Sequence, residues 1–250
     1  AARRSTAKPD RGQWWVIAAA GIALGVHFAT WLASLELTSV AASVTLVSTA
    51  PIIIAIVQVV GGQRPPARTW WAIAAAFAGT IIIAGSDATA AWPSGASGDR
   101  SALFGDGLAL IGAISMAFYL MAGDRLRSTL STAGYASGAY GVAAATSLVV
   151  ATGSGVELTG YDRRTWLAIA AMVVGPQLLG HTALNHLLAK LGSLTVALAL
   201  LLEPLGAALL VLVLFGDVPP LGAILGAPLV IAAVALQVVH QPLKIGGAQP

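Results

Sequence analysis

One acidic side chain lies deep inside an otherwise uncharged apolar run, and its chemistry stands out first. Glu203 lies near the middle of residues 193–215, directly before Pro204. A carboxylate in a low-dielectric medium costs several kcal/mol unless it faces a cavity, finds a partner or is protonated. Pro204 removes a backbone donor and leaves a carbonyl free nearby. We predict that Glu203 faces a central cavity and that its protonation is linked to function; a protonated Glu bonded to a neighbouring helix is the structural alternative.

Two stripes of polar and aromatic side chains recur at helical spacing. Gln177, His181 and Asn185 follow one another at intervals of four, which places them on one helix face. A similar stripe on residues 14–35 contains His27, Trp31 and Ser34. Donors and acceptors beside an aromatic wall suit an aqueous substrate cavity, whereas hydrogen bonding between helices is the alternative for each stripe. The predicted cavity residues are His27, Trp31, Ser34, Ser48, Tyr119, Gln177, His181, Asn185 and Glu203.

Catalytic and metal chemistry find less support in the sequence. His27, His181, His186 and Glu203 are residue types that suit zinc, but they lack the usual spacing and would have to converge from three helices. No Gly-x-Ser-x-Gly motif occurs, and no phosphate-binding loop is present. The chain contains no cysteine, which excludes thiolate ligands and a cysteine nucleophile. We predict no catalytic residue, no metal and no cofactor.

The composition places these residues in a membrane protein. Apolar residues make up 57% of the 250 positions and charged residues 9%, and the mean hydropathy is +0.84. A bilayer core takes about 20 apolar residues of helix, and eight runs qualify. Because the runs are apolar on both faces, they predict helices rather than barrel strands. The runs are 14–35, 38–60, 69–85, 104–122, 134–152, 165–189, 193–215 and 218–239.

Basic residues between the runs predict the orientation. With the amino end in the cytoplasm, ten Lys and Arg residues fall inside and three fall outside, as the positive-inside rule requires. Eight spans return the chain to its starting side, so both termini are expected in the cytoplasm and the protein in the cell (inner) membrane. The inside residues are Arg3, Arg4, Lys8, Arg11, Arg64, Arg68, Arg125, Arg127, Lys190 and Lys244; the outside residues are Arg100, Arg163 and Arg164.

The chain also contains an internal repeat. HFATWLASLELTS (27–39) aligns with HTALNHLLAKLGS (181–193) at an offset of 154, and each leads into a helix that carries a proline, Pro51 or Pro204. The second copy has two more helices ahead of the shared part. Five helices per copy is an odd number, which gives an inverted-topology repeat. We therefore infer ten helices in the complete protein and eight in this chain, with Pro51 and Pro204 as hinge residues.

The two copies resemble the signature regions of the drug/metabolite transporter superfamily, EamA type. The most specific parts are Leu-Glu-Pro at 202–204, HFATW at 27–31 and GHTALN at 180–185. The resemblance implies two inverted five-helix repeats around a central cavity that move metabolites by alternating access. Residues 1–85 would then be the remainder of the first repeat, 86–101 a polar linker, 102–241 the second repeat and 242–250 a C-terminal tail. Gln63 and Asp217 stand where the family usually has Glu.

These observations favour a secondary transporter, with export as the expected direction, of small metabolites across the cytoplasmic membrane. The expected partners are a small-molecule substrate, protons as the coupling ion and the lipid bilayer, and no nucleic acid. Two alternatives remain: a membrane-embedded enzyme with a His/Glu site, and a non-transporting membrane scaffold. The inverted repeat favours transport, because alternating access uses such symmetry directly.

Overall fold

A computed structural model describes residues 9–87, 100–127, 129–216, 218–219 and 221–239. Every regular element in these ranges is a helix, and eight helical segments are long and apolar enough to cross a membrane. The predicted all-α fold with eight spans is therefore confirmed. Asp217 and the expected cytoplasmic segments at residues 1–8 and 240–250 lie outside the described residues, and so does most of the predicted linker.

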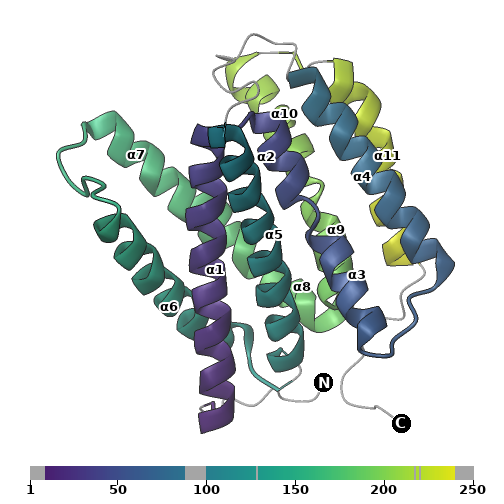
Figure 1. The fold of residues 1–250 in the computed structure, drawn as a ribbon, viewed down its shortest axis with the longest axis horizontal. Coiled ribbons are helices and arrows are strands. Elements are labelled where there is room, and N and C mark those ends of the chain that lie inside the picture. Colours follow the sequence, from purple (N-terminus) through teal and green to yellow (C-terminus); the bar gives the residue numbers. More distant parts are fainter. Residues whose placement is uncertain (1–8, 88–99, 128, 217, 220, 240–250) are drawn as a thin grey trace. The chain divides into compact units, whose positions relative to one another are not determined.

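Five of the eight spans are single helices and three are interrupted (Figure 1). The single helices are α1 (Arg11–Leu37), α4 (Ala67–Asp87), α5 (Arg100–Leu126), α6 (Thr132–Gly153) and α11 (Leu221–Val239). The interrupted spans are α2 (Val40–Val47) with α3 (Ala50–Val60), α7 (Arg163–Met172) with η1 (Val173–His181) and α8 (Thr182–Leu191), and α9 (Ser193–Leu200) with α10 (Glu203–Phe215).

Local chemistry explains where these segments begin and break. Ser39 precedes α2 and its side chain accepts a hydrogen bond from the Ala42 N–H, which satisfies a free donor of the first turn. Pro51 lies in the first turn of α3, and Pro204 in the first turn of α10. Because proline has no N–H, the carbonyl four residues earlier receives no helical bond from it, and the helix ends before it.

The chain forms two compact units, each assembled from separate stretches of sequence. Among the described residues, the first unit contains 9–26 and 118–192, and the second unit contains 27–117 and 193–239. Helices α1 and α5 each contribute one part to the first unit and one part to the second. Units of contact therefore do not coincide with the two predicted repeats, whose boundary stays a prediction.

The second unit is centred on close packing of α4 against α11, which lie side by side in Figure 1. Gly79 and Gly226 allow this approach, because a Cβ atom on Gly226 would lie 2.5 Å from the carbonyl oxygen of Gly79. One buried polar network joins the ends of three spans: Thr69 donates to Gln237 at 3.1 Å, and Gln237 donates to Thr195 at 3.3 Å.

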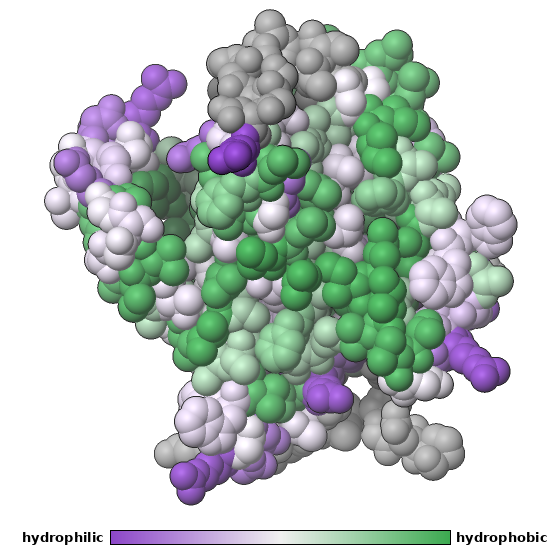
Figure 2. Space-filling model, viewed as in Figure 1, coloured by the Kyte–Doolittle hydropathy of each residue, from purple (hydrophilic) through white to green (hydrophobic). Residues whose placement is uncertain are grey.

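The first unit packs α1 against α6 through small residues. A Cβ atom on Gly21 would lie 2.6 Å from the carbonyl oxygen of Ala139, and one on Gly25 would lie 2.7 Å from Cβ of Thr146. The spacing of four between Gly21 and Gly25 thus serves packing inside the unit. Apolar side chains cover most of the visible helix faces, whereas hydrophilic side chains gather at helix ends (Figure 2). This distribution suits a chain whose helix faces contact lipid.

Candidate substrate-binding groups

The stripe predicted on α1 lies in the second unit and forms a connected polar cluster. The ring of His27 stacks on Trp31, with 5.7 Å between ring centroids and 21° between planes. His27 is buried, and its Nδ1–H donates to the carbonyl oxygen of Gly112 in α5 at 3.0 Å. The hydrogen bond fixes the imidazole ring against α5. The indole Nε1 of Trp31 is buried and has no hydrogen-bond partner within the described ranges.

Ser34 completes this stripe but is engaged with the protein itself. Its Oγ donates to the carbonyl oxygen of Trp31 at 2.6 Å and lies 2.6 Å from Oγ of Ser43 in α2. A hydroxyl carries one hydrogen, so Ser43 donates to Ser34 when Ser34 donates to Trp31. Both serines are completely buried. The geometry of Ser34 therefore matches the structural alternative, a hydrogen bond between helices.

The first unit brings together another part of the predicted set, at Asn185 and Tyr119. The amide nitrogen of Asn185 donates to the hydroxyl of Tyr119 at 2.7 Å and to the hydroxyl of Tyr140 at 2.9 Å. Asn185 is completely buried and Tyr119 is 1% exposed. The ring of His181 lies 6.4 Å from that of Tyr119. Three helices, α5, α6 and α8, thus meet at one amide group.

A buried arginine holds the backbone of α8 next to this cluster. Arg127 is completely buried, and its Nε donates to the backbone carbonyl oxygen of Asn185 at 2.9 Å. The same guanidinium donates to the carbonyl oxygen of Leu130 and, at 2.5 Å, to the hydroxyl of Thr132. The sequence placed Arg127 among loop charges that set the orientation. A buried arginine needs acceptors for its guanidinium donors, and these three hydrogen bonds tie the end of α5 to α6 and α8.

The stripe of Gln177, His181 and Asn185 does not lie on a regular α-helix. Gln177 and His181 belong to the π-helix η1, which contains Pro176, and only Asn185 lies on α8. A π-helix bonds residue i to i+5, so the turn is wider than the spacing of four assumes. Gln177 and His181 are half-buried, whereas Asn185 is buried. Runs of π-helix this long are rare, and apolar periodicity carries no signal for them.

Ser48, Pro51, Glu203 and Pro204 lie at the breaks of two spans in the second unit. Ser48 follows α2, and its hydroxyl donates to the carbonyl oxygen of Val44 at 2.6 Å. Glu203 is the first residue of α10 and is exposed in this structure. The breaks correspond in detail: an offset of 153 separates the start of α2 from that of α9, the end of α2 from that of α9, and the start of α3 from that of α10.

Two acidic residues near helix ends have defined partners. Asp106 accepts a hydrogen bond from the hydroxyl of Thr38 at 2.7 Å, which holds the α1–α2 connection on α5. Asp162 caps α7, and hydrogen bonds from the hydroxyl and the backbone N–H of Thr165 lower the pKa of its carboxyl below the ordinary 3.8. In the described part of the chain, no group of three or more His, Asp or Glu side chains is placed to hold a metal ion.

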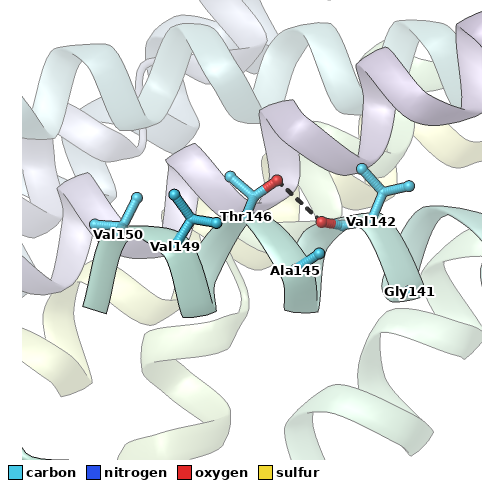
Figure 3. A pocket seen from close by; sticks show the side chains of 6 residues that line it. All are labelled: Gly141, Val142, Ala145, Thr146, Val149 and Val150. Atoms are coloured by element: carbon cyan, nitrogen blue, oxygen red, sulfur yellow. Dashed lines mark hydrogen bonds between the residues drawn. The ribbon is translucent and has the colours of Figure 1, made fainter. Parts of the chain in front are cut away.

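Two hollows on the surface are lined by residues outside the predicted cavity set. One, of about 400 Å³, runs along α6 and is almost entirely apolar (Figure 3). Its only hydroxyl, that of Thr146, donates to the carbonyl oxygen of Val142 at 2.9 Å. A second hollow is lined by Arg11, Trp14, Trp15 and Ala18 of α1. An apolar depression with its hydroxyl already bonded suits a lipid chain better than a polar substrate.

Eight apolar spans, inward-packed glycines and buried polar clusters define a polytopic α-helical membrane protein. The EamA-like transporter family matches residues 1–85 and 103–239. The chain therefore belongs to the EamA-like transporter family, whose members are transporters rather than enzymes and carry small molecules across membranes.

Comparison with other proteins adds the fold alone. No curated protein matches the chain. Among solved structures, 11 chains match. One of them, described only as "Crystal structure of protein", is 19% identical, with a TM-score of 0.72 over 90% of this chain and 76% of that one. At that identity the likeness supports the helical architecture and says nothing about substrate.

Proposed function

We propose that the protein is a secondary transporter that exports small polar or amphipathic metabolites across the cytoplasmic membrane by alternating access. The observation that carries this proposal is the matched pair of broken spans, α2–α3 and α9–α10, whose breaks at Pro51 and Pro204 agree in register. In transporters built from inverted repeats, discontinuous helices expose backbone groups near the bilayer midplane, where substrate and coupling ion bind. The two prolines are the proposed hinges.

The proposed substrate contacts are the predicted cavity residues that the structure leaves available. Trp31 and Asn185 each carry a buried polar atom that lacks a hydrogen-bond partner in the described structure. Glu203, at the first turn of α10, is the proposed proton-coupling group, because it is an acid at a helix break in mid-span. Ser34 and Ser48 donate to the helix backbone, so we assign them packing roles. We also propose that transport is coupled to protons and that both termini lie in the cytoplasm.

Transport is tested with the purified chain in proteoliposomes loaded with a defined mixture of metabolites. Mass spectrometry of the lumen after dilution should show protein-dependent loss of a small subset, which faster exchange with external compound would confirm as carrier-mediated. Protein-free vesicles provide the baseline. If no member of a broad mixture leaves faster than from these vesicles, transport of this class is refuted.

Alternating access has a sharp test, because the chain has no native cysteine. A Gln177→Cys variant should react with a membrane-impermeant thiol reagent applied from either side, since its half-buried position is proposed to face the cavity. Leu179→Cys, in the same π-helix but 68% exposed on an apolar face, is the matched control and should stay unreactive in lipid. Reaction of Gln177→Cys from one side under all conditions would contradict alternating access.

A further inference from the structure

The amide of Asn185 is held in one orientation by contacts from three directions. Its two amide hydrogens are both used, on the hydroxyls of Tyr119 and Tyr140. Its backbone carbonyl oxygen receives the Nε–H of Arg127. With both hydrogens committed, the amide plane is fixed, and the direction of its oxygen Oδ1 follows from that plane.

That oxygen has no hydrogen-bond partner within the described ranges, although Asn185 is completely buried. A buried acceptor left unpaired costs about 1–3 kcal/mol. A buried polar group without a protein partner therefore needs an explanation. In a transporter, one explanation is that the group binds the substrate. The two tyrosine hydroxyls accept from the amide and also hydrogen-bond each other, so one of them still has its hydrogen to donate.

We propose that Asn185 Oδ1 is a substrate-binding acceptor that selects molecules carrying a neutral N–H or O–H donor, with Tyr119 and Tyr140 as the residues that position it. An acceptor beside tyrosine hydroxyls complements groups that both donate and accept, such as a carboxamide, an imide or an alcohol. The ring of His181, 6.4 Å from that of Tyr119, adds a flat wall on which a planar group packs.

The helix that precedes α8 suggests how a substrate reaches the buried Asn185 amide. The π-helix η1 directly precedes α8, and its contacts are mainly with its chain neighbours α7 and α8. The residues of η1 are half-buried or exposed. A partly exposed, non-standard helix next to a buried site is a place where a span can rearrange at low cost. The substrate would therefore reach Asn185 in another state of the transport cycle.

This inference rests on the proposed transport function, but its test measures binding. The full chain, purified in nanodiscs, is heated with probe pairs in which methyl groups replace the hydrogens of the donor: nicotinamide against N,N-dimethylnicotinamide, uracil against 1,3-dimethyluracil, and 1,2-propanediol against 1,2-dimethoxypropane. At least one donor-bearing probe should raise the melting temperature, and its apparent affinity should exceed that of its methylated partner about 5- to 150-fold.

Substitutions test whether the affinity ratio between donor-bearing and methylated probes depends on Asn185 Oδ1. In Asn185→Leu the ratio should fall to about one, because the acceptor is gone. Tyr135→Phe is the control: it removes a hydroxyl that approaches the carbonyl oxygen of Tyr119 at 3.5 Å and leaves the contacts of Asn185 intact, so its ratio should stay unchanged. If Asn185→Leu does not fold, Tyr140→Phe decides, since freeing one amide hydrogen should lower the ratio severalfold.

The outcomes separate the two proposals. Failure of every donor-bearing probe to bind better than its methylated partner, or an unchanged ratio in the Asn185 or Tyr140 variant, overturns the assignment and leaves Oδ1 satisfied by a buried water only. Transport without any preference for donor-bearing compounds would also overturn the assignment of Asn185 Oδ1, but it would leave the proposed transport function intact. Donor-selective binding without transport in vesicles would retain the site and refute the transporter.

Discussion

The crossing of α4 and α11 at Gly79 and Gly226 yields a prediction about stability, and the structure gives the size of the expected change. In Gly226→Ala the new Cβ would lie 2.5 Å from the carbonyl oxygen of Gly79 and 2.6 Å from Cγ1 of Ile83. Because Cβ atoms essentially never approach other heavy atoms within 3.0 Å, the two helices must separate by about half an ångström at the crossing. Overpacking of this kind costs about 1–3 kcal/mol.

Two further effects act in opposite directions. A rigid shift of the same size would stretch the Thr69–Gln237 hydrogen bond, now 3.1 Å, beyond a useful length, which costs about 1 kcal/mol. Alanine in a helix is about 1 kcal/mol more favourable than glycine, which offsets that loss. We therefore expect Gly226→Ala to lower the free energy of unfolding by about 2 kcal/mol. Equilibrium unfolding in mixed micelles, followed by tryptophan fluorescence, measures it.

Matched variants make the result interpretable. Gly85→Ala lies in α4, where a Cβ meets nothing within 4 Å, and should leave stability unchanged or raise it by up to about 1 kcal/mol. Gly79→Ala combined with Gly226→Ala should cost less than the two single changes added, because one separation relieves both contacts. A Gly226→Ala protein as stable as the unaltered chain would refute the close packing of α4 on α11.

Three other sites give predictions of their own. Glu203→Gln keeps the shape of the side chain and removes its proton exchange, so pH-dependent substrate movement in vesicles should be abolished at an unchanged protein level; unaltered transport across the pH range would reduce Glu203 to a structural residue. Pro176→Ala should let η1 approach regular α-helical hydrogen bonding and slow transport, as vesicle assays would show, with stability equal or higher; normal rates would exclude a role for the π-helix. Because the pKa of Asp162 is lowered in the folded chain, its cap on α7 should stabilise the helix end above the ordinary pKa of 3.8 and weaken as the pH falls through the lower folded value. Hydrogen exchange at Thr165, corrected for the intrinsic pH effect, should show this loss, and Asp162→Asn should remove the pH dependence.

The sequence predicted the spans well, because length and apolar composition are what a bilayer selects. Gly21 and Gly25 are spaced by four, which favours close packing, but this spacing does not tell which helix receives them. Gly226, four positions after Gly222, packs on Gly79, whose neighbours four positions away are Ala75 and Ile83 rather than a second glycine. A close helix crossing needs a small residue on each of the two helices. The spacing of small residues within one helix does not reveal the small residue on its partner helix.

The candidate site was harder to predict, because its chemistry depends on contacts between distant segments. Tyr119 and Asn185 were both predicted as cavity residues, but their hydrogen bond joins positions 66 apart, and the sequence does not pair them. Arg127 was counted as an exposed loop charge, because a basic residue between two apolar runs ordinarily serves topology. Its burial follows from the acceptors that α6, α8 and the connection at Leu130 present to it, and no local pattern contains that information.

In the predicted repeat, the two aligned stretches agree more closely in position than in residue type. His27 and His181 occupy equivalent positions at the offset of 154, yet His27 donates to Gly112 from a regular α-helix, whereas His181 ends a π-helix beside Tyr119. One turn further along, Trp31 and Asn185 are equivalent by the same offset. Each places a buried polar atom where the described structure offers it no partner, an N–H donor in one copy and an amide oxygen acceptor in the other. At these aligned positions of the sequence, a hydrogen-bonding group is therefore present in both stretches, but its polarity is reversed.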